Sequence, residues 1–246
     1  DLASPGNQLH AHLVQKQPVL MSFGAWKPFL AQYMPTWDRV LIDSGAFSEI
    51  NSGVAIDGAA YRDWYQPYED RVDAVAGLDN INGDWQQSLK NYEQYGGFPT
   101  YHDTDPPELL PDLIDIARER GRWIGIGLKP PREGKEDFIR RTLDRMPHDL
   151  HVHGWALRRY RHLGRLDSMD STNWWRDAMK IRTMPLMDHL SYGEALEIII
   201  KRYARWQPPE VQEQEEQISL FSQEANYDVS LSLSRAQRAD RGRIPP

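Results

Sequence analysis

Short apolar runs recur along this chain and alternate with stretches of helical character. The runs are Val19–Phe23, Arg39–Asp43, Ala74–Asp79, Phe98–His102, Trp123–Gly127, Leu150–His153, Leu166–Asp170 and, less clearly, Ile181–Met184. Apolar runs of this length, bounded by turn-forming residues, are typical of buried strands. Eight such strands separated by helices predict parallel pairing with crossover connections, and therefore an α/β fold.

The segments between these runs carry helix start and stop signals. Asp57 is suited to capping a helix over Asp57–Arg71, and prolines open another over Pro106–Arg120, which closes before Gly121. The other predicted helices are Gly83–Tyr95, Glu133–Arg145 and Tyr192–Arg205. No Gly-rich dinucleotide fingerprint follows the first strand, and polar residues cluster where the strands end. We therefore predict a compact TIM-type (β/α)8 barrel rather than a doubly wound sheet.

The character of the chain changes after Arg205. Gln207–Gln217 is rich in Pro, Glu and Gln, and the last residues are rich in Ser, Arg and Pro. Such a composition cannot bury a core and is typical of a mobile segment. The sequence therefore predicts a barrel over residues 1–205 and a polar tail over residues 206–246.

Composition excludes several classes of protein. The 246 residues include no cysteine, which removes disulfides, thiolate nucleophiles and cysteine-ligated zinc. No apolar run is long enough to span a membrane and no leader pattern opens the chain, so we expect a cytoplasmic protein. The net charge of −7 argues against a general nucleic-acid binder, but residues 118–165 hold 13 Lys and Arg against 6 Asp and Glu. This segment forms either a basic face or two solvated outer helices.

Two of the runs end in an acid that small polar residues follow at once. Asp43 follows Val40-Leu41-Ile42, and Asp170 ends the run that begins at Leu166. Two carboxylates at strand ends suit chemistry at a sugar carbon, where one attacks and the other moves a proton. The alternative is that each acid caps the next helix. Asp167 is a rival nucleophile, but its odd spacing from Asp170 places it on the opposite face of the strand.

Residues near the first and third strands suit binding of a planar base. Ser44 and Gly45 allow a tight turn that brings backbone amides close to a ligand, and Phe47 offers a ring for stacking. Asp79 could accept hydrogen bonds from the amide and amino edge of guanine, or could instead cap the helix near Gly83.

Histidines raise the question of a metal site. His151 and His153 lie two apart on one face of a strand, and His102 ends another. No carboxylate-rich ligand set surrounds them at a recognisable spacing. We therefore predict hydrogen-bonded histidines, with neither metal nor cofactor.

Five segments together resemble the tRNA-guanine transglycosylase superfamily. They are Asp43–Phe47, Gly77–Asp79, Ile124–Gly127, His153–Ala156 and Ser168–Trp174, in that order along the chain. The resemblance covers roughly residues 19–205 and is greatest to the compact phage and bacterial branch that inserts 7-deazaguanines into DNA. The first and last segments are fairly specific, whereas the glycine pairs are weak alone.

The resemblance implies a base-exchange enzyme that uses a covalent aspartyl-sugar intermediate. Asp170 then matches the nucleophile, Asp43 the general acid/base and Asp79 the base-recognising carboxylate. The remaining implied substrate contacts are Ser44, Phe47, Gly125, Gly127, His153 and Gly154. Guanine in the nucleic acid would be exchanged for a free 7-deazaguanine base.

Two departures from the family bear on the substrate. The tRNA enzymes carry a zinc site of three cysteines and one histidine, which this chain cannot form, and they have a glycine and a glutamine where this chain has Ala46 and Ser48. DNA is therefore the expected substrate. The alternatives are the same chemistry on tRNA, a nucleoside or glycoside hydrolase, and a non-catalytic nucleic-acid-binding barrel.

Two further features predict macromolecular partners. Arginines in two clusters are expected to hold the phosphates of the nucleic acid, namely Arg140, Arg141, Arg158, Arg159, Arg161 and Arg165. In the tail, Gln217-Ile-Ser-Leu-Phe221 resembles the peptide by which bacterial DNA enzymes dock on the sliding clamp, with Leu220 and Phe221 entering an apolar pocket. A chance match is the alternative. An ATP-dependent partner that opens the duplex is also plausible.

Overall fold

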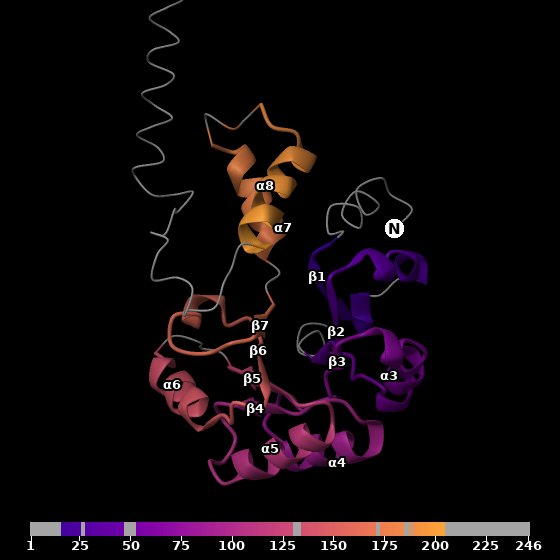
Figure 1. Ribbon diagram of the computed structural model, residues 1–246, viewed down its shortest axis with the longest axis vertical. Coiled ribbons are helices and arrows are strands. Elements are labelled where there is room, and N and C mark those ends of the chain that lie inside the picture. The colour runs from indigo at the N-terminus through magenta and orange to yellow at the C-terminus, as the bar shows by residue number, and fades with distance from the viewer. Residues whose placement is uncertain are drawn as a thin grey trace, which may run out of the picture. The chain divides into compact units, whose positions relative to one another are not determined.

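The computed structural model describes residues 16–25, 28–46, 53–129, 134–170, 173–184, 187 and 189–204 (Figure 1). Seven strands lie within these ranges: β1 (Pro18–Ser22), β2 (Arg39–Asp43), β3 (Ala74–Val75), β4 (Thr100–His102), β5 (Trp123–Gly127), β6 (His151–Gly154) and β7 (Ser168–Met169). Strands β2 and β5 have the bounds that the sequence predicts, and the others lie within or one residue beyond the predicted runs.

All pairings between these strands are parallel. Strands β1, β2 and β3 form one sheet, and β4, β5, β6 and β7 form a second, each in sequential order. A bridge between Ala76 and Phe98 joins the two sheets, where Phe98 N–H donates to Val75 and Gly77 N–H donates to Phe98. The mixed α/β fold with parallel strands is thus confirmed. No pairing among the described residues closes the strands into a ring.

Helices separate most of the strands. They are α3 (Gly58–Tyr65), α4 (Trp85–Tyr95), α5 (Leu109–Glu119), α6 (Glu136–Arg145), α7 (Asn173–Arg182) and α8 (Tyr192–Ala204). The predicted cap is present, because the Asp57 carboxylate accepts from the N–H groups of Ala59 and Ala60. The predicted helix continues after Tyr65 as a 3-10 turn, Gln66–Arg71. In the described part of the chain, no helix is long and apolar enough to cross a membrane.

Short 3-10 turns complete the described structure. Three lie between β1 and β2, at Phe23–Ala25, Pro28–Gln32 and Met34–Thr36, and one follows β6 at Arg158–Tyr160.

The prediction of a strand over Ile181–Met184 is wrong. Ile181 lies in α7, one helical turn from Ala178, and both residues are buried. Helix α7 packs against α8, whose Ala195, Leu196 and Ile199 are also buried. Apolar residues three or four positions apart lie on one face of a helix. A segment of only four residues is too short to distinguish this spacing from that of a buried strand.

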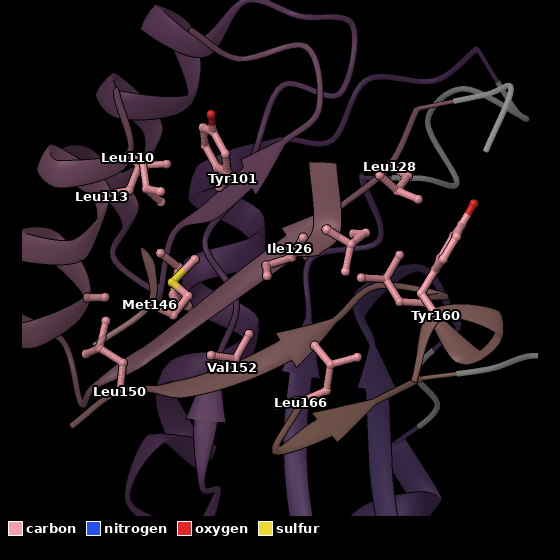
Figure 2. Packing of buried hydrophobic residues seen from close by; sticks show 14 of the residues in the cluster. Tyr101, Leu110, Leu113, Ile126, Leu128, Met146, Leu150, Val152, Tyr160 and Leu166 are labelled. Atoms are coloured by element: carbon pink, nitrogen blue, oxygen red, sulfur yellow. The ribbon is translucent and has the colours of Figure 1, made fainter. Parts of the chain in front are cut away.

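One face of each strand packs against helices. In β5 and β6, Ile124, Ile126 and Val152 belong to a core that includes Leu110 and Leu113 of α5 (Figure 2). In β1 and β2, Met21, Val40 and Ile42 belong to a second core, together with Tyr61 and Tyr65 of α3. Side chains alternate along a strand, so the strand residues that come between these core residues point to the opposite face of each sheet.

The opposite faces of the two sheets share a third cluster, and no residue of a described helix belongs to it. They are called the helix-free faces below. Leu41, Ala76, Phe98 and Trp123 are all buried in it, and Trp155 packs against them. The Phe98 and Trp155 rings stack with centroids 6.2 Å apart. Among the described residues, side chains from both sheets therefore bury this face.

Candidate active site

Polar side chains lie at the carboxyl ends of the strands on this helix-free face. Asp43 shares the face with Leu41, His102 with Thr100, and His153 lies across from Ser168 in the β6–β7 register. Strands that pair in parallel end at one edge of their sheet. The alternation of side chains and the common strand direction together place these residues where parallel α/β folds bind their ligands.

Asp43 is the last residue of β2 and its carboxyl group is held by short-range contacts. It accepts hydrogen bonds from Gly45 N–H and from the Ser22 hydroxyl, at the end of β1. Gly45 adopts a left-handed φ of 78°, which favours glycine at this turn. Burial raises the pKa of Asp43 to about 6, although both hydrogen bonds lower it, and the charges of Asp170 and Asp79 add to the rise.

The charges of Asp170 and Asp79 contribute less to the raised pKa of Asp43 than burial does. A nearby like charge disfavours ionisation of Asp43, so it acts in the same direction as burial. A carboxyl group that titrates near neutral pH is suited to giving and taking a proton.

Asp79 pairs with a histidine from the next strand. His102, at the end of β4, places Nε2 2.6 Å from Asp79 Oδ2, and both side chains are nearly buried. Burial lowers the pKa of His102, but the hydrogen bond to Asp79 and the charges of Asp79 and Asp105 outweigh it, so the pKa is raised. The alternative of a capping role for Asp79 is wrong, since Asp84 caps α4 by accepting from Gln87 N–H.

Asp170 follows β7 and is held by the loop after β6. Its Oδ1 accepts from Ala156 N–H at 2.6 Å and lies 3.6 Å from His153 Nε2. The rival Asp167 lies at the other end of β7. There its carboxylate accepts a hydrogen bond from Val152 N–H and forms an ion pair with Arg165. These contacts connect the beginnings of β6 and β7.

The two glycines predicted to line the base make room for aromatic side chains. A Cβ on Gly127 would lie 2.5 Å from His102 Nδ1, and one on Gly125 would lie 2.4 Å from Trp155 Nε1. Trp155 Nε1 donates to Thr100 Oγ1 at 3.0 Å, a contact that needs this space. Gly154 is also crowded, with Leu157 and Leu166 near the position of a Cβ. The glycines thus shape the face through their neighbours.

Of the two substrate-binding residues predicted just after β2, the structure describes only Ser44. Ser44 is buried, and its hydroxyl oxygen accepts from Ala46 N–H at 3.3 Å. Phe47 lies outside the described residues, as do Gln217, Leu220 and Phe221 of the tail.

A pocket of about 210 Å³ opens beside Asp79. The residues that line it include four with amide side chains, Asn80, Asn82, Gln87 and Asn91. Asp79 also lines it, whereas Asp43 and Asp170 do not. The pocket is therefore lined by one of the three acids and not by the other two.

The predicted phosphate-binding arginines occupy three places. Arg140 and Arg141 are exposed on α6. Arg158, Arg159 and Arg161 lie in or next to the turn after β6, where Arg158 pairs with Asp177 at 3.2 Å. Arg165 lies near the starts of β6 and β7, bonded to Asp167 and to the Leu150 carbonyl. It is therefore remote from the strand ends that carry Asp170.

The two histidines of β6 lie at different ends of the strand. His151 is exposed and its ring packs on Trp123 with centroids 4.9 Å apart, whereas His153 is buried. Over the described ranges, no group of three or more His, Cys, Asp or Glu side chains is arranged to hold a metal ion.

Sequence reasoning missed the partners of the three carboxylates. Ser22, Ser168, Ala156 and His102 each contact one of them or its neighbouring histidine. Ser22 and His102 are visible in the sequence as polar residues that end strands. The Ala156 contact depends on a loop with positive φ, and no sequence pattern marks it.

Comparison with known proteins found no matching family model, no similar curated protein and no similar solved structure. The site offers one carboxyl group with a pKa near neutral, one carboxylate held by a backbone N–H, and a carboxylate–histidine pair.

Proposed function

We propose that this chain is a base-exchange transglycosylase that replaces guanine in DNA with a 7-deazaguanine through a covalent Asp170–sugar ester. The observation that carries the proposal is the placement of the three acids: Asp43 ends β2, Asp79 pairs with His102 at the end of β4, and Asp170 follows β7, all at the carboxyl ends of parallel strands. Base exchange needs one group to attack C1′, one to move protons and one to hold the base. Three carboxylates with different partners supply these roles.

We also propose that the strands form a TIM-type barrel. The seven strands follow one another in sequential parallel order, whereas a doubly wound sheet reverses its order near the ligand site. Burial of Leu41, Phe98 and Trp123 in one cluster supports inward-facing side chains from both sheets.

In the first half of the reaction, Asp170 attacks C1′ of the target deoxyguanosine. The bond from C1′ to N9 breaks, its electrons pass to the departing base, and protonated Asp43 supplies the proton that neutralises it. An ester between Asp170 and C1′ is left, formed through an oxocarbenium-like transition state. The raised pKa of Asp43 suits it to this step, because part of the population is protonated near neutral pH.

In the second half, the incoming 7-deazaguanine loses its N9 proton to the Asp43 carboxylate. N9 then attacks C1′, and the ester bond to Asp170 breaks, which returns the electron pair to the carboxylate. Both carboxyl groups regain their starting protonation states. The exchange therefore needs no cofactor and no water.

Asp79 and His102 are proposed to recognise the base. The hydrogen bond from His102 occupies one oxygen of Asp79 and leaves lone pairs on both oxygens. A carboxylate oriented in this way accepts from the ring N–H and the amino group of guanine, and a 7-deazaguanine presents the same edge. Adenine lacks both donors at these positions, so the pair would exclude it.

DNA is the proposed macromolecular substrate, on the resemblance set out above and on the lack of cysteine for the tRNA enzymes' zinc site. To expose C1′, the target nucleotide must leave the base stack, at a cost of roughly a few kcal/mol. Arginines after β6 are proposed to hold the flanking phosphates, since they follow the strand that carries His153.

Two protein partners complete the proposal. The segment Gln217–Phe221 is proposed to bind a sliding clamp, and an ATP-dependent protein is proposed to open the duplex. Deletion of Gln217–Phe221 should abolish co-elution with the clamp while leaving exchange on short oligonucleotides intact. Unchanged co-elution would refute the clamp assignment.

Radiolabelled guanine exchange tests the proposal and its alternatives in one experiment. The chain is incubated with labelled guanine and single-stranded DNA, duplex DNA or tRNA, and incorporation is measured. Asp170→Asn should abolish incorporation, and Asp144→Asn, at an exposed position on α6, should not. Incorporation into tRNA alone would favour the tRNA alternative. Release of base without incorporation would indicate a hydrolase, and neither activity with retained binding would indicate a non-catalytic protein.

A further inference from the structure

His153 is buried, yet one of its ring nitrogens has no hydrogen-bond partner. The side chain is 3% exposed, and Nε2 faces Asp170 Oδ1 at 3.6 Å, just beyond hydrogen-bond length. A buried polar atom without a hydrogen-bond partner lowers the stability of the fold, so its presence indicates a role other than stability. The nearby carboxylate is the residue to which the proposed function assigns the attack on C1′.

The other ring nitrogen is fixed by the neighbouring strand. His153 Nδ1 lies 2.7 Å from Ser168 Oγ, and these two residues are register partners in β6 and β7. The ring also packs edge-on against Trp155, with centroids 4.3 Å apart. The orientation of the imidazole is thereby set before any substrate binds.

The position of Asp170 selects between the two neutral forms of this ring. If Nδ1 carried the proton, the lone pair of Nε2 would face a carboxylate oxygen in a poorly solvated place, which is repulsive. If Nε2 carries the proton, its N–H points at Oδ1 while Nδ1 accepts from the Ser168 hydroxyl. Only the second arrangement is favourable at both nitrogens.

We propose that His153 is a positioning residue that acts through Asp170, with its proton on Nε2 and its tautomer set by Ser168. Oδ1 of Asp170 then has two N–H groups directed at it, from Ala156 at 2.6 Å and from His153. Oδ2 has neither and is the oxygen that attacks C1′. This inference rests on the proposed function. It assigns His153 a contact with Asp170 in place of the direct substrate contact that the resemblance implies.

The two donors also assist departure from the ester. In the intermediate, Oδ1 is the carbonyl oxygen, and when the ester bond breaks the returning charge is shared between both oxygens. Donors placed beforehand at Oδ1 stabilise that charge as it develops. Such contacts are often long in the absence of substrate and shorten in the complex. Loss of the His153 donor should therefore lower kcat and leave KM nearly unchanged.

Three variants separate this role from simple packing. His153→Met removes the donor at similar size and should slow breakdown of the Asp170 adduct by added 7-deazaguanine on the order of 10–100-fold, as expected for a hydrogen bond to a group on which charge develops. His153→Gln restores an N–H donor and should recover at least about tenfold of that rate. Ser168→Ala removes the tautomer lock and should slow the step by about threefold to tenfold.

A measurement on the unmodified chain keeps the proposal testable if a variant fails to fold. Nitrogen-15 NMR of histidine-labelled protein reports the tautomer of each of the 8 histidines, and the signals absent in His153→Gln identify His153. We expect the Nε2–H form. An Nδ1–H form would overturn the proposal, as would an unchanged rate of adduct breakdown in His153→Met.

The failure of this inference is distinguishable from failure of the proposed function. If Asp170→Asn still forms the adduct, the nucleophile assignment falls, while the NMR result still decides the tautomer. If Asp170→Asn abolishes the adduct but all His153 variants react normally, only the positioning role falls.

Discussion

His102 Nε2 lies 2.6 Å from Asp79 Oδ2, which links the end of β4 to the loop that follows β3. His102 belongs to the second sheet, and the loop that carries Asp79 leaves the last strand of the first sheet. Their pair therefore joins the sheets at the strand ends, just as the bridge between Ala76 and Phe98 joins them along the backbone. The same carboxylate is the one proposed to recognise guanine.

This pair should make stability depend on pH in a defined direction. The pKa of His102 is raised in the folded chain from its ordinary value of 6.5, so the folded state binds the proton more tightly than the unfolded state. The stabilisation is fully present below pH 6.5 and is lost as pH rises through the folded pKa. The free energy of unfolding of the chain minus that of His102→Gln should fall over this interval in urea titrations. A difference that rises with pH would contradict the assignment.

Asp43 should show a pH effect of related form. Its pKa is raised from 3.8 to about 6 on folding, so the folded state holds a proton that the unfolded state releases. As pH rises between these two values, ionisation of Asp43 lowers the free energy of unfolding of the chain. Above pH 6 this loss reaches about 3 kcal/mol. Asp43→Asn should therefore be more stable than the unmodified chain at pH 7 and similar at pH 4, while losing exchange activity. Equal effects of the variant at both pH values would refute the raised pKa.

Gly127 should be intolerant of a side chain because of His102. A Cβ there would lie 2.5 Å from His102 Nδ1, so Gly127→Ala should destabilise the fold by about 1–3 kcal/mol and weaken base binding. In the background of His102→Ala the clash is absent, and the same substitution should cost much less. Gly24→Ala, with nothing near the added carbon, is the matched control. Equal costs in both backgrounds would show that His102 is not the cause.

The arginines should divide into two functional groups. Arg159→Gln should weaken DNA binding and reduce the salt dependence of log K by about 0.9, since it lies in the turn after β6. Arg165→Gln should leave the salt dependence unchanged and lower the free energy of unfolding by about 1–3 kcal/mol, because its partners are Asp167 and the Leu150 carbonyl. Fluorescence anisotropy at several salt concentrations and urea unfolding separate the two. A reduced salt slope for Arg165→Gln would contradict this division.

The sequence predicted most of the elements because their signals are local. Apolar runs ending in Gly, Asp or His located β2 and β5 to the residue, and Asp57 located the start of α3. Ile181–Met184 failed because four residues do not distinguish a strand from a buried turn of helix, and its packing depends on α8.

Of the site residues, the three acids could be predicted from the sequence, whereas the residues that contact them could not. Asp43, Asp79 and Asp170 could be chosen because each follows an apolar run. Their partners, such as Ser22 for Asp43, depend on which strand lies beside which and at what register. The role of Gly127 could not be read locally either, since the ring that needs its space comes from β4.

Identification of the residue that is esterified by the nucleic acid tests the central claim most directly. The chain is incubated with single-stranded DNA in the absence of free base, quenched with acid, digested and examined by mass spectrometry. The account predicts a deoxyribose-linked peptide modified at Asp170, absent in Asp170→Asn and released when 7-deazaguanine is added. A sugar ester on another carboxylate, or turnover with no ester at all, would contradict it.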